Sequence, residues 1–519
     1  MMNKPNYART LLVIVLFVCV LQLNAQVLTS KQIDSVVEKT LTTFNVPGIA
    51  VAVIKDGKVV HAKGYGVRSI KTNIQTDENT LFGVASNTKA MTAALLGMLV
   101  DEHKITWDTK VTDIIPEFKL YDPYVTSEFA IRDLLTHRSG LGLGAGDLMI
   151  WPDSSTVTKA QLIHNLRYLK PVSSFRTKYD YDNLLYIVAG EVIARVAGTT
   201  YEDFLENRIF KPLGMTKTAA SWYRLKDKSN IIDGHAPYEG KLLPVGLSFG
   251  EVANAAGGVY SNVVDMSKWV ACMINGGKYG DKLEKTLFST AVAKELWTPQ
   301  TIINGGGQQG SFTSYGLGWF LSNLNGNFQA THTGGLSGIV TQVTILPAQK
   351  LGIIVLTNQQ SGAAFNAISS TIKDGYLNIK GIDRIKAYNE NRLAREKEAN
   401  EMVTKILKEI NAVGTIKQPD ITHYMDTYAD AWFGEVNISS KNGKLHFQAK
   451  NSPKLRGDMT YYKGNTFIVK WYDRSLDADA FVNFSLDHEG KANGFKMAAI
   501  SPLTDFSFDF QDLDFRMVR

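Results

Sequence analysis

The sequence predicts an α/β (α+β) domain, with one antiparallel sheet flanked by helices plus a helical subdomain, followed by a small all-β barrel-like domain. Its 519 residues are too many for one ordinary hydrophobic core. Strand patterns lie near both ends of the first part with helical patterns between them, and short, regularly spaced strands fill the last part. We therefore expect a signal peptide at 1–25, the first domain at 26–384, a helical linker at 385–426 and the β domain at 427–519.

The first residues have the pattern of an export signal. Lys4 and Arg9 precede an apolar run from Leu11 to Leu21, which is too short to span a bilayer, and Ala25 offers a cleavage site. An uncleaved membrane anchor and lipidation at Cys19 are the alternatives. We expect a cleaved, exported protein, periplasmic or secreted, that keeps no stable membrane anchor.

Periodicity and turn residues predict the elements of the first domain. Asp56-Gly57 indicates the tip of a hairpin, and a Gly-rich stretch at 140–146 interrupts a mainly helical region. The expected elements are a helix at 30–44, strands at 49–54 and 59–64, a helix at 86–103, mixed helices and loops at 105–250, a helix at 265–275, and strands at 340–346 and 351–357.

The residue pattern changes twice in the last part of the chain. Residues 385–413 are strongly charged and favour a solvated helix between the domains. The strands expected after it are 434–439, 444–448, 459–462, 466–471, 480–486, 494–500 and 506–510. We expect this domain to contribute stability or substrate selectivity, and no chemistry.

Composition excludes several classes of function. The net charge of +6 is modest and no basic run is interleaved with aromatic residues, so no nucleic-acid partner is expected. The nine histidines show no zinc spacing, and there is no Walker-type Gly-x-x-x-x-Gly-Lys-Ser/Thr phosphate loop, so we expect no metal and no cofactor. After signal cleavage Cys272 is the single cysteine, which excludes an internal disulfide and predicts a buried structural thiol.

The clearest chemical pattern is the pair Ser86 and Lys89. An apolar segment leads into Ser86 and a helix-forming run follows, so these side chains share one helix face. A Ser hydroxyl needs a neighbouring base, and a partly desolvated Lys can be that base or lower the pKa of another one. The N-terminus of a helix also favours an oxyanion. The pair therefore predicts acyl transfer through a covalent intermediate.

A second Ser-x-x-Lys, at Ser370 and Lys373, requires a choice. A true site is expected to precede a Tyr-x-Asn triplet and then a basic residue-x-Gly triplet on a strand. After Ser86 these triplets are Tyr181-Asp182-Asn183 and His332-Thr333-Gly334. After Ser370 the candidates are a Tyr-x-Asn almost adjacent to it and a Lys-Asn-Gly typical of a hairpin turn. We favour Ser86.

With these motifs the sequence resembles the serine β-lactamase and penicillin-binding-protein superfamily, in its class C-like branch. The similarity runs from about residue 46 to about residue 358 and includes segments at 46–58, 131–141, 256–261 and 315–319. The C-terminal segment resembles the lipocalin-like domain that follows many hydrolases of this group. The resemblance implies an acyl-enzyme mechanism, no cofactor, and a small-molecule or peptide substrate.

The resemblance also implies a role for each motif residue. Ser86 would attack a carbonyl carbon, while Lys89 and Tyr181 would share the acid–base work. A Lys89 ammonium would favour the phenolate of Tyr181, and which of the two is the base stays open. Asn183 would hydrogen-bond the substrate amide or the Lys89 side chain.

The strand triplet is expected to bind substrate through His332, Gly334 and Gly335, with the N–H groups of Ser86 and Gly335 as the oxyanion hole. His332 stands where penicillin-recognising enzymes usually have Lys. Since His is mostly neutral at pH 7, we expect weak recognition of a β-lactam carboxylate that improves toward pH 6. Asp182 is charged where small residues are common, and the direction of its effect stays open.

The sequence therefore predicts an exported serine hydrolase acting on esters or amides such as D-amino-acid-containing peptides, with esterase, D-aminopeptidase and carboxypeptidase activities left open. The alternatives are a genuine class C-like β-lactamase and a non-catalytic penicillin- or peptide-binding sensor. The oligomeric state stays open.

Overall fold

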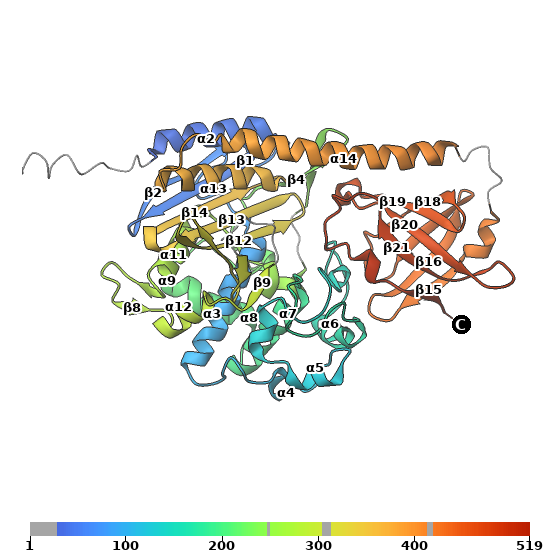
Figure 1. Cartoon of the computed structure of the whole chain (residues 1–519), viewed down its shortest axis with the longest axis horizontal. Coiled ribbons are helices and arrows are strands. Elements are labelled where there is room, and N and C mark those ends of the chain that lie inside the picture. Colours follow the sequence, from blue (N-terminus) through green and yellow to red (C-terminus); the bar gives the residue numbers. More distant parts are fainter. Residues whose placement is uncertain (1–27, 247–249, 304–312, 413–418, 519) are drawn as a thin grey trace, which may run out of the picture.

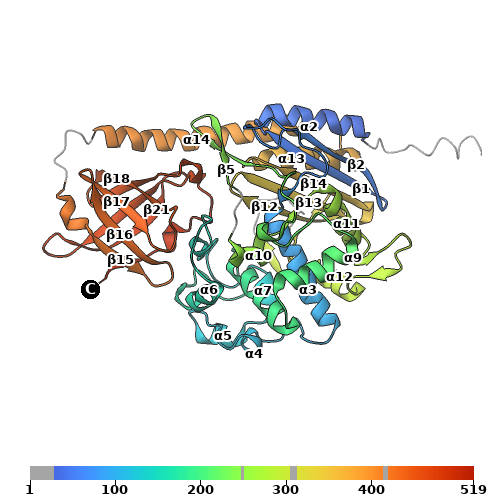
Figure 2. The ribbon, with the colours of Figure 1, turned by 180° about the vertical axis from the view of Figure 1, so that it is seen from behind.

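A computed structural model describes residues 28–246, 250–303, 313–412 and 419–518 (Figures 1 and 2). The expected signal peptide lies outside these residues. Within them, no single helix has the length and apolarity to cross a membrane, although the bent pair Leu184–Ala197 and Tyr201–Leu213 passes on length and composition.

An eight-stranded antiparallel sheet forms the centre of the first domain, in the order β2-β1-β14-β13-β12-β11-β10-β9. The N-terminal strand β1 pairs with β14, so segments from the two ends of the domain close one sheet as predicted. The strands are β1 (Gly48–Lys55), β2 (Lys58–Gly66), β9 (Thr301–Ile303), β10 (Thr313–Tyr315), β11 (Phe320–Leu324), β12 (Asn327–Leu336), β13 (Ile339–Leu346) and β14 (Leu351–Thr357).

Helices cover both faces of this sheet (Figure 1). One face carries α2 (Ser30–Phe44) and α13 (Gly362–Tyr376), whose apolar residues share a core with alternate residues of β1 and β14. The other face carries α11 (Val263–Ile274), which contacts β1 and β14. Because β1 is covered on both faces, its sequence is a continuous apolar run instead of an alternating one.

The helical subdomain lies below the sheet in Figure 1 and contains the predicted nucleophile helix, α3 (Thr88–Asp101). Its other helices are α4 (Val111–Ile114), α5 (Pro123–Glu128), α6 (Lys159–Asn165), α7 (Leu184–Ala197), α8 (Tyr201–Leu205), α9 (Lys211–Leu213), α10 (Asn254–Gly257) and α12 (Thr290–Leu296). Three small hairpins or bridges accompany them: β3 (Phe82–Gly83) with β6 (Tyr260–Ser261), β4 (Gly234–Tyr238) with β5 (Lys241–Val245), and β7 (Lys278–Tyr279) with β8 (Lys285–Thr286).

The C-terminal domain is a closed eight-stranded antiparallel barrel. Large side chains such as Tyr428, Phe447 and Trp471 are buried, so its interior is a packed core. Its strands are β15 (Asp426–Asp430), β16 (Gly434–Lys441), β17 (Lys444–Ala449), β18 (Arg456–Lys463), β19 (Thr466–Trp471), β20 (Ala480–Leu486), β21 (Ala492–Ala499) and β22 (Phe515–Met517).

One predicted strand is wrong. The alternation Phe506-Ser507-Phe508-Asp509-Phe510 has the period of a strand, yet these residues form an irregular segment between β21 and β22 that ends in a short 3₁₀ helix at Phe510–Asp512. The reason is tertiary, because the segment packs against the first domain. Asp509 accepts hydrogen bonds from the backbone N–H groups of Gly146 (2.6 Å) and Leu148 (3.0 Å).

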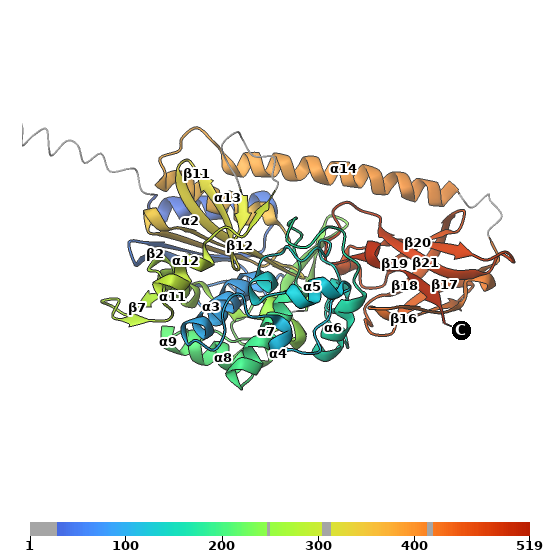
Figure 3. The same cartoon turned by 60° about the horizontal axis from the view of Figure 1, so that its bottom comes forward.

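The two domains are joined in two ways. The 29-residue helix α14 (Arg384–Ala412) runs along one side of both domains (Figure 3) and packs Ile406 against the barrel. Direct contacts supplement it: Lys454 forms an ion pair with Asp153 at 2.6 Å, and the rings of Phe508 and Trp151 meet edge to face. The barrel is thus docked beside the helical subdomain.

Candidate active site

Ser86 lies in a 3₁₀ turn (Ala85–Asn87) between β3 and α3. Ala85 adopts a left-handed backbone conformation with φ of 50°, which costs energy for a residue with a Cβ. The turn is held by the buried side chain of Asn87, whose Nδ2 donates to the hydroxyl of Thr341 at 2.8 Å. This tight turn presents the half-buried hydroxyl of Ser86 at the start of α3.

The Lys89 ammonium reaches Ser86 as the sequence predicted. Its Nζ lies 3.0 Å from Oγ of Ser86, 2.7 Å from Oδ1 of Asn183 and 2.8 Å from the carbonyl oxygen of Ala256. A neutral lysine amine has two N–H donors and one lone pair. The two outer acceptors, Asn183 and Ala256, can take both N–H groups, which leaves the lone pair facing the Ser86 proton.

Burial allows the Lys89 amine to be neutral near pH 7. The Lys89 side chain is fully buried, and desolvation lowers its pKa from about 10.5 to about 7, against the attraction of the Asp147 and Asp182 carboxylates. A base with a pKa near the working pH is the one best suited to proton transfer. Lys89 therefore has the environment of a general base.

Tyr181 lies on the other side of the same lysine. Lys89 Nζ is 4.9 Å from the centre of the Tyr181 ring, and the phenol hydrogen-bonds the Ser86 hydroxyl. Desolvation raises the pKa of Tyr181 well above 10, in spite of that hydrogen bond. This differs from the expectation that Lys89 would favour the phenolate, because burial disfavours both charged forms and outweighs their attraction.

Asn183 links Lys89 to a buried carboxyl group. Its Oδ1 accepts from Lys89, and its Nδ2 donates to Oδ2 of Asp147 at 2.7 Å. Asp182 is also buried, but its Oδ1 accepts from the N–H groups of Leu184 (2.8 Å) and Leu185 (3.3 Å) at the start of α7. Two residues of the Tyr-Asp-Asn triplet therefore have different roles: Asn183 accepts a hydrogen bond from Lys89, and Asp182 accepts hydrogen bonds from the first N–H groups of α7.

His332 is buried and uncharged. Its side chain is 1% exposed, with Nε2 2.8 Å from the Tyr315 hydroxyl and Nδ1 2.6 Å from the carbonyl oxygen of Thr333. Burial and the nearby Lys89 lower its pKa to about 3. The expectation that His332 gains charge toward pH 6 is therefore corrected, because the imidazole stays neutral, whereas its role in substrate binding stays a prediction: its ring centre lies 6.3 Å from that of Tyr181.

The pleat of the strand explains why His332 is buried. Successive residues of β12 face opposite sides, so Thr333 and Gly335 face the cavity while His332 and Gly334 face inward. Gly334 supports the turn: a Cβ there would lie 2.4 Å from the carbonyl oxygen of Val84. Gly335 is exposed and has open space where a Cβ would be, so of the expected strand residues it is the one that borders the cavity beside Ser86.

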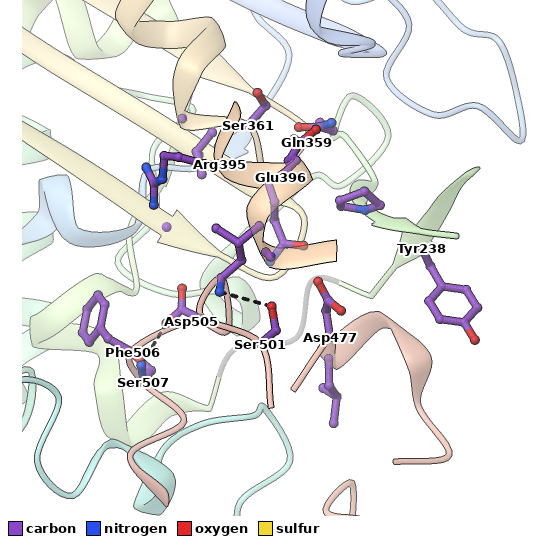
Figure 4. A pocket seen from close by; sticks show the side chains of 18 of the residues that line it. Tyr238, Gln359, Ser361, Arg395, Glu396, Asp477, Ser501, Asp505, Phe506 and Ser507 are labelled. Carbon is purple, nitrogen blue, oxygen red and sulfur yellow. Dashed lines mark hydrogen bonds between the residues drawn. The ribbon is translucent and has the colours of Figure 1, made fainter. Parts of the chain in front are cut away.

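A cavity of about 2150 Å³ opens from Ser86, and three parts of the chain line it. Tyr181 and Gly335 line its inner end, Arg395 comes from α14, and Phe506 comes from the barrel. Figure 4 shows the outer region, where side chains of α14 and of the irregular barrel segment converge. Within the described ranges, no group of three or more His, Cys, Asp or Glu is arranged to hold a metal ion.

The family model of the beta-lactamases matches residues 33–373, which is well over half of the chain and includes every motif residue above. The chain belongs to the beta-lactamase family. This is a family of serine hydrolases, and here its domain is followed by a second match, at residues 411–517, to a domain of unknown function called DUF3471.

Relatives within the beta-lactamase family have diverse names. Unguisins hydrolase of Aspergillus violaceofuscus is 30% identical over 373 residues, covering 67% of this chain and 65% of that protein. Protein Flp of Staphylococcus aureus (strain COL) is 26% identical over 345 residues, covering 64% of each chain. The chain thus spans slightly under two thirds of the length of these curated relatives.

Solved structures show the same fold. The octameric penicillin-binding protein homologue from Pyrococcus abyssi aligns with a TM-score of 0.61 at 20% identity, covering 93% of this chain and 99% of that one. A class C beta-lactamase aligns with a TM-score of 0.55 at 22% identity, covering 67% of this chain and 96% of that one. The first alignment extends over most of the C-terminal barrel as well.

The second Ser-x-x-Lys pair of this beta-lactamase-family chain lies on α13, outside the cavity. Lys373 donates to Oε1 of Gln329 at 2.9 Å, and Ser370 contacts the Tyr388 hydroxyl at 3.3 Å. The two side chains thus have separate partners.

Several residues of the site were not found from the sequence. Asp147, His137 and Ser507 are buried around the motif residues, and the His137 ring centre lies 4.2 Å from that of Tyr181. A Gly-rich stretch before Asp147 was visible, but no spacing rule connects it with Ser507, more than three hundred residues later. Cys272 is buried as expected, and burial raises the pKa of its thiol to about 12.

Proposed function

We propose that this protein is an exported serine hydrolase that forms an acyl-enzyme on Ser86 and acts on esters or amides, such as D-amino-acid-containing peptides. The contact between Ser86 and Lys89 carries the proposal, because it joins a nucleophile to a base whose pKa is about 7. Ser86 would attack the carbonyl carbon while its proton passes to Lys89. The leaving group would then receive a proton from the Lys89–Tyr181 pair, and water would release the acyl group.

The size of the cavity supports an extended substrate. Pockets for drug-sized ligands span roughly 300–1,000 Å³, and this cavity is larger, at about 2150 Å³. The walls supplied by α14 and the barrel lie beyond Ser86, where the leaving group or the acyl chain of an oligomer would extend. A peptide fits such a space better than a small ester does.

A class C-like β-lactamase is the second candidate, favoured by the fold shared with a class C beta-lactamase. The inward-facing His332 argues against it, because the strand triplet then offers no cation to a substrate carboxylate. A non-catalytic sensor would have no use for a desolvated Lys89. We also propose the lipocalin-like relationship for the C-terminal barrel, on its closed eight-stranded form.

A fluorophosphonate probe followed by mass spectrometry tests the proposal. The wild type should carry one adduct, on the peptide that contains Ser86. Ser370→Ala, the matched control, should label normally, whereas Ser86→Ala should not label. Absence of wild-type labelling would contradict the proposal, and adducts at Ser370 would contradict the choice of nucleophile. Rates for p-nitrophenyl esters, D-alanyl peptides and a chromogenic cephalosporin would then identify the substrate class.

A further inference from the structure

The irregular segment of the barrel, residues 505–509, forms part of the catalytic site. The Phe506 ring lies edge to face on Tyr181, with ring centres 5.8 Å apart. A Cβ at Gly144 would lie 2.6 Å from the Phe506 carbonyl oxygen, so this close approach requires glycine. The segment thus fits a surface of the first domain that is shaped for it.

A chain of hydrogen bonds runs from the barrel to the nucleophile. The Ser507 hydroxyl donates to Oδ2 of Asp147 at 2.8 Å, and Asn183 Nδ2 donates to the same oxygen at 2.7 Å. Asn183 Oδ1 accepts from Lys89 at 2.7 Å, and Lys89 lies 3.0 Å from Ser86. The five side chains connect two domains through buried polar contacts.

The orientation of the Asn183 amide explains how this series of hydrogen bonds acts on Lys89. With Nδ2 on a carboxylate, Oδ1 faces Lys89 and accepts one of its N–H groups. A reversed amide would present N–H to Lys89 and compete for the lone pair that must accept the Ser86 proton. Asp147 sets this orientation because its Oδ2 accepts from both Asn183 and Ser507, whether the group is ionised or carries a proton on Oδ1, which has no partner among the described residues.

We propose that Ser507 of the barrel is a positioning residue for acylation: it holds the Asp147 carboxylate so that Asn183 keeps its amide oxygen on Lys89. This inference rests on the proposed function. It goes beyond the expectation that the C-terminal domain stays outside the chemistry, because the barrel supplies a hydrogen bond three side chains from Ser86.

The electrostatics predict the direction in which the pKa of Lys89 changes when the Ser507 hydroxyl is removed. Burial raises the pKa of Asp147 to about 8, and the Ser507 hydrogen bond opposes this rise. Without the hydroxyl, Asp147 loses negative charge at a given pH, so the Lys89 ammonium loses attraction and its pKa falls below about 7. The other titratable groups around this pair are Asp182, Tyr181, Tyr186, His137, His332 and Asp509.

The experiment compares Ser507→Ala with Ser485→Ala, a substitution of an exposed serine on the far strand β20 that does not line the cavity. Fluorophosphonate labelling of Ser86 is followed over pH 5–9. For Ser507→Ala we expect the plateau rate to fall about tenfold, since one buried hydrogen bond is lost. Its rising limb should move to lower pH by about half a pH unit. Ser485→Ala should match the wild type, and Ser507→Thr, which keeps a hydroxyl, should recover most of the rate.

A second measurement is independent of catalysis. In protein with ¹³C-labelled lysine, the Lys89 resonance is assigned by its loss in Lys89→Arg and titrated in wild type and Ser507→Ala. A lower midpoint in the variant supports the proposal even if the wild type fails to label, which would refute only the proposed function. An unchanged midpoint of the Lys89 titration, together with an unchanged rising limb of the labelling rate in Ser507→Ala, overturns the proposal. So does a drop in rate that follows the melting temperature alone, because the hydroxyl would then serve stability only.

Discussion

The hydroxyl of Tyr315 lies 2.8 Å from Nε2 of His332, and both side chains are buried. The one basic side chain of the His-Thr-Gly triplet is thus buried beside Tyr181, with ring centres 6.3 Å apart. Desolvation and the nearby Lys89 lower the pKa of His332 to about 3, so the triplet adds no second cation next to Lys89.

We therefore expect the enzyme to prefer a p-nitrophenyl ester to a chromogenic cephalosporin, and the ratio of their kcat/KM values to stay constant between pH 8 and pH 6. No protonation of His332 occurs in that interval, so carboxylate recognition gains nothing on acidification. Steady-state kinetics with both substrates decide this. A ratio that shifts toward the cephalosporin at pH 6 would show that an imidazolium does reach the substrate.

The pH profile of acylation should have a rising limb near pH 7. A neutral Lys89 amine is required, its pKa is about 7, and so the rate increases as pH rises through that value. Lys89→Arg, which stays charged, should lower the rate by at least about a hundredfold. Lys373→Arg, at the second motif, is the matched control and should keep the wild-type profile. Retention of the limb in Lys89→Arg would assign it to another group.

Tyr181→Phe should fold normally and lose roughly 10²–10⁴ in acylation rate, because a proton-transfer partner of Ser86 is removed. Since burial holds the pKa of Tyr181 well above 10, the rising limb near pH 7 should remain where it is. Stopped-flow labelling across pH measures both quantities. Near-native turnover would instead leave Lys89 as the sole proton-transfer group.

Asp182 should make the protein less stable as pH rises. Burial raises its pKa to about 7 in the folded state, against 3.8 for an ordinary aspartate, so the folded state binds more protons between these values. Its contribution to stability is therefore present at low pH and lost between about pH 4 and pH 7. Asp182→Asn can still accept from Leu184 and Leu185 and cannot ionise.

Thermal melts of the wild type and Asp182→Asn from pH 5 to pH 8 should diverge, with the variant gaining on the order of 1–3 kcal/mol relative to the wild type at the upper end. Parallel curves would mean that Asp182 is ionised or protonated equally in both states. Melts of Asp487→Asn, in an exposed barrel turn, provide a comparison in which no such gain is expected.

Local spacing predicted the features that depend only on neighbouring residues. Ser86 and Lys89 meet because three positions along a helix bring side chains to one face. The helix Ser30–Phe44 and the strand Leu351–Thr357 were predicted at their observed bounds, since amphipathic and apolar patterns reflect which faces are buried. The same alternation gave a false strand at 506–510, where burial against another domain imitates the pattern of a sheet.

The sequence by itself determined the family and predicted the nucleophile, its lysine and the order of the domains, because motif order and short-range periodicity are written along the chain. The tertiary structure alone decided which face of β12 His332 occupies, which of Lys89 and Tyr181 has a pKa near neutrality, and that Ser507 contacts Asp147. Each of these depends on desolvation or on contacts between distant segments. Such effects arise only when the barrel, the helical subdomain and the sheet pack together and exclude water from the groups between them.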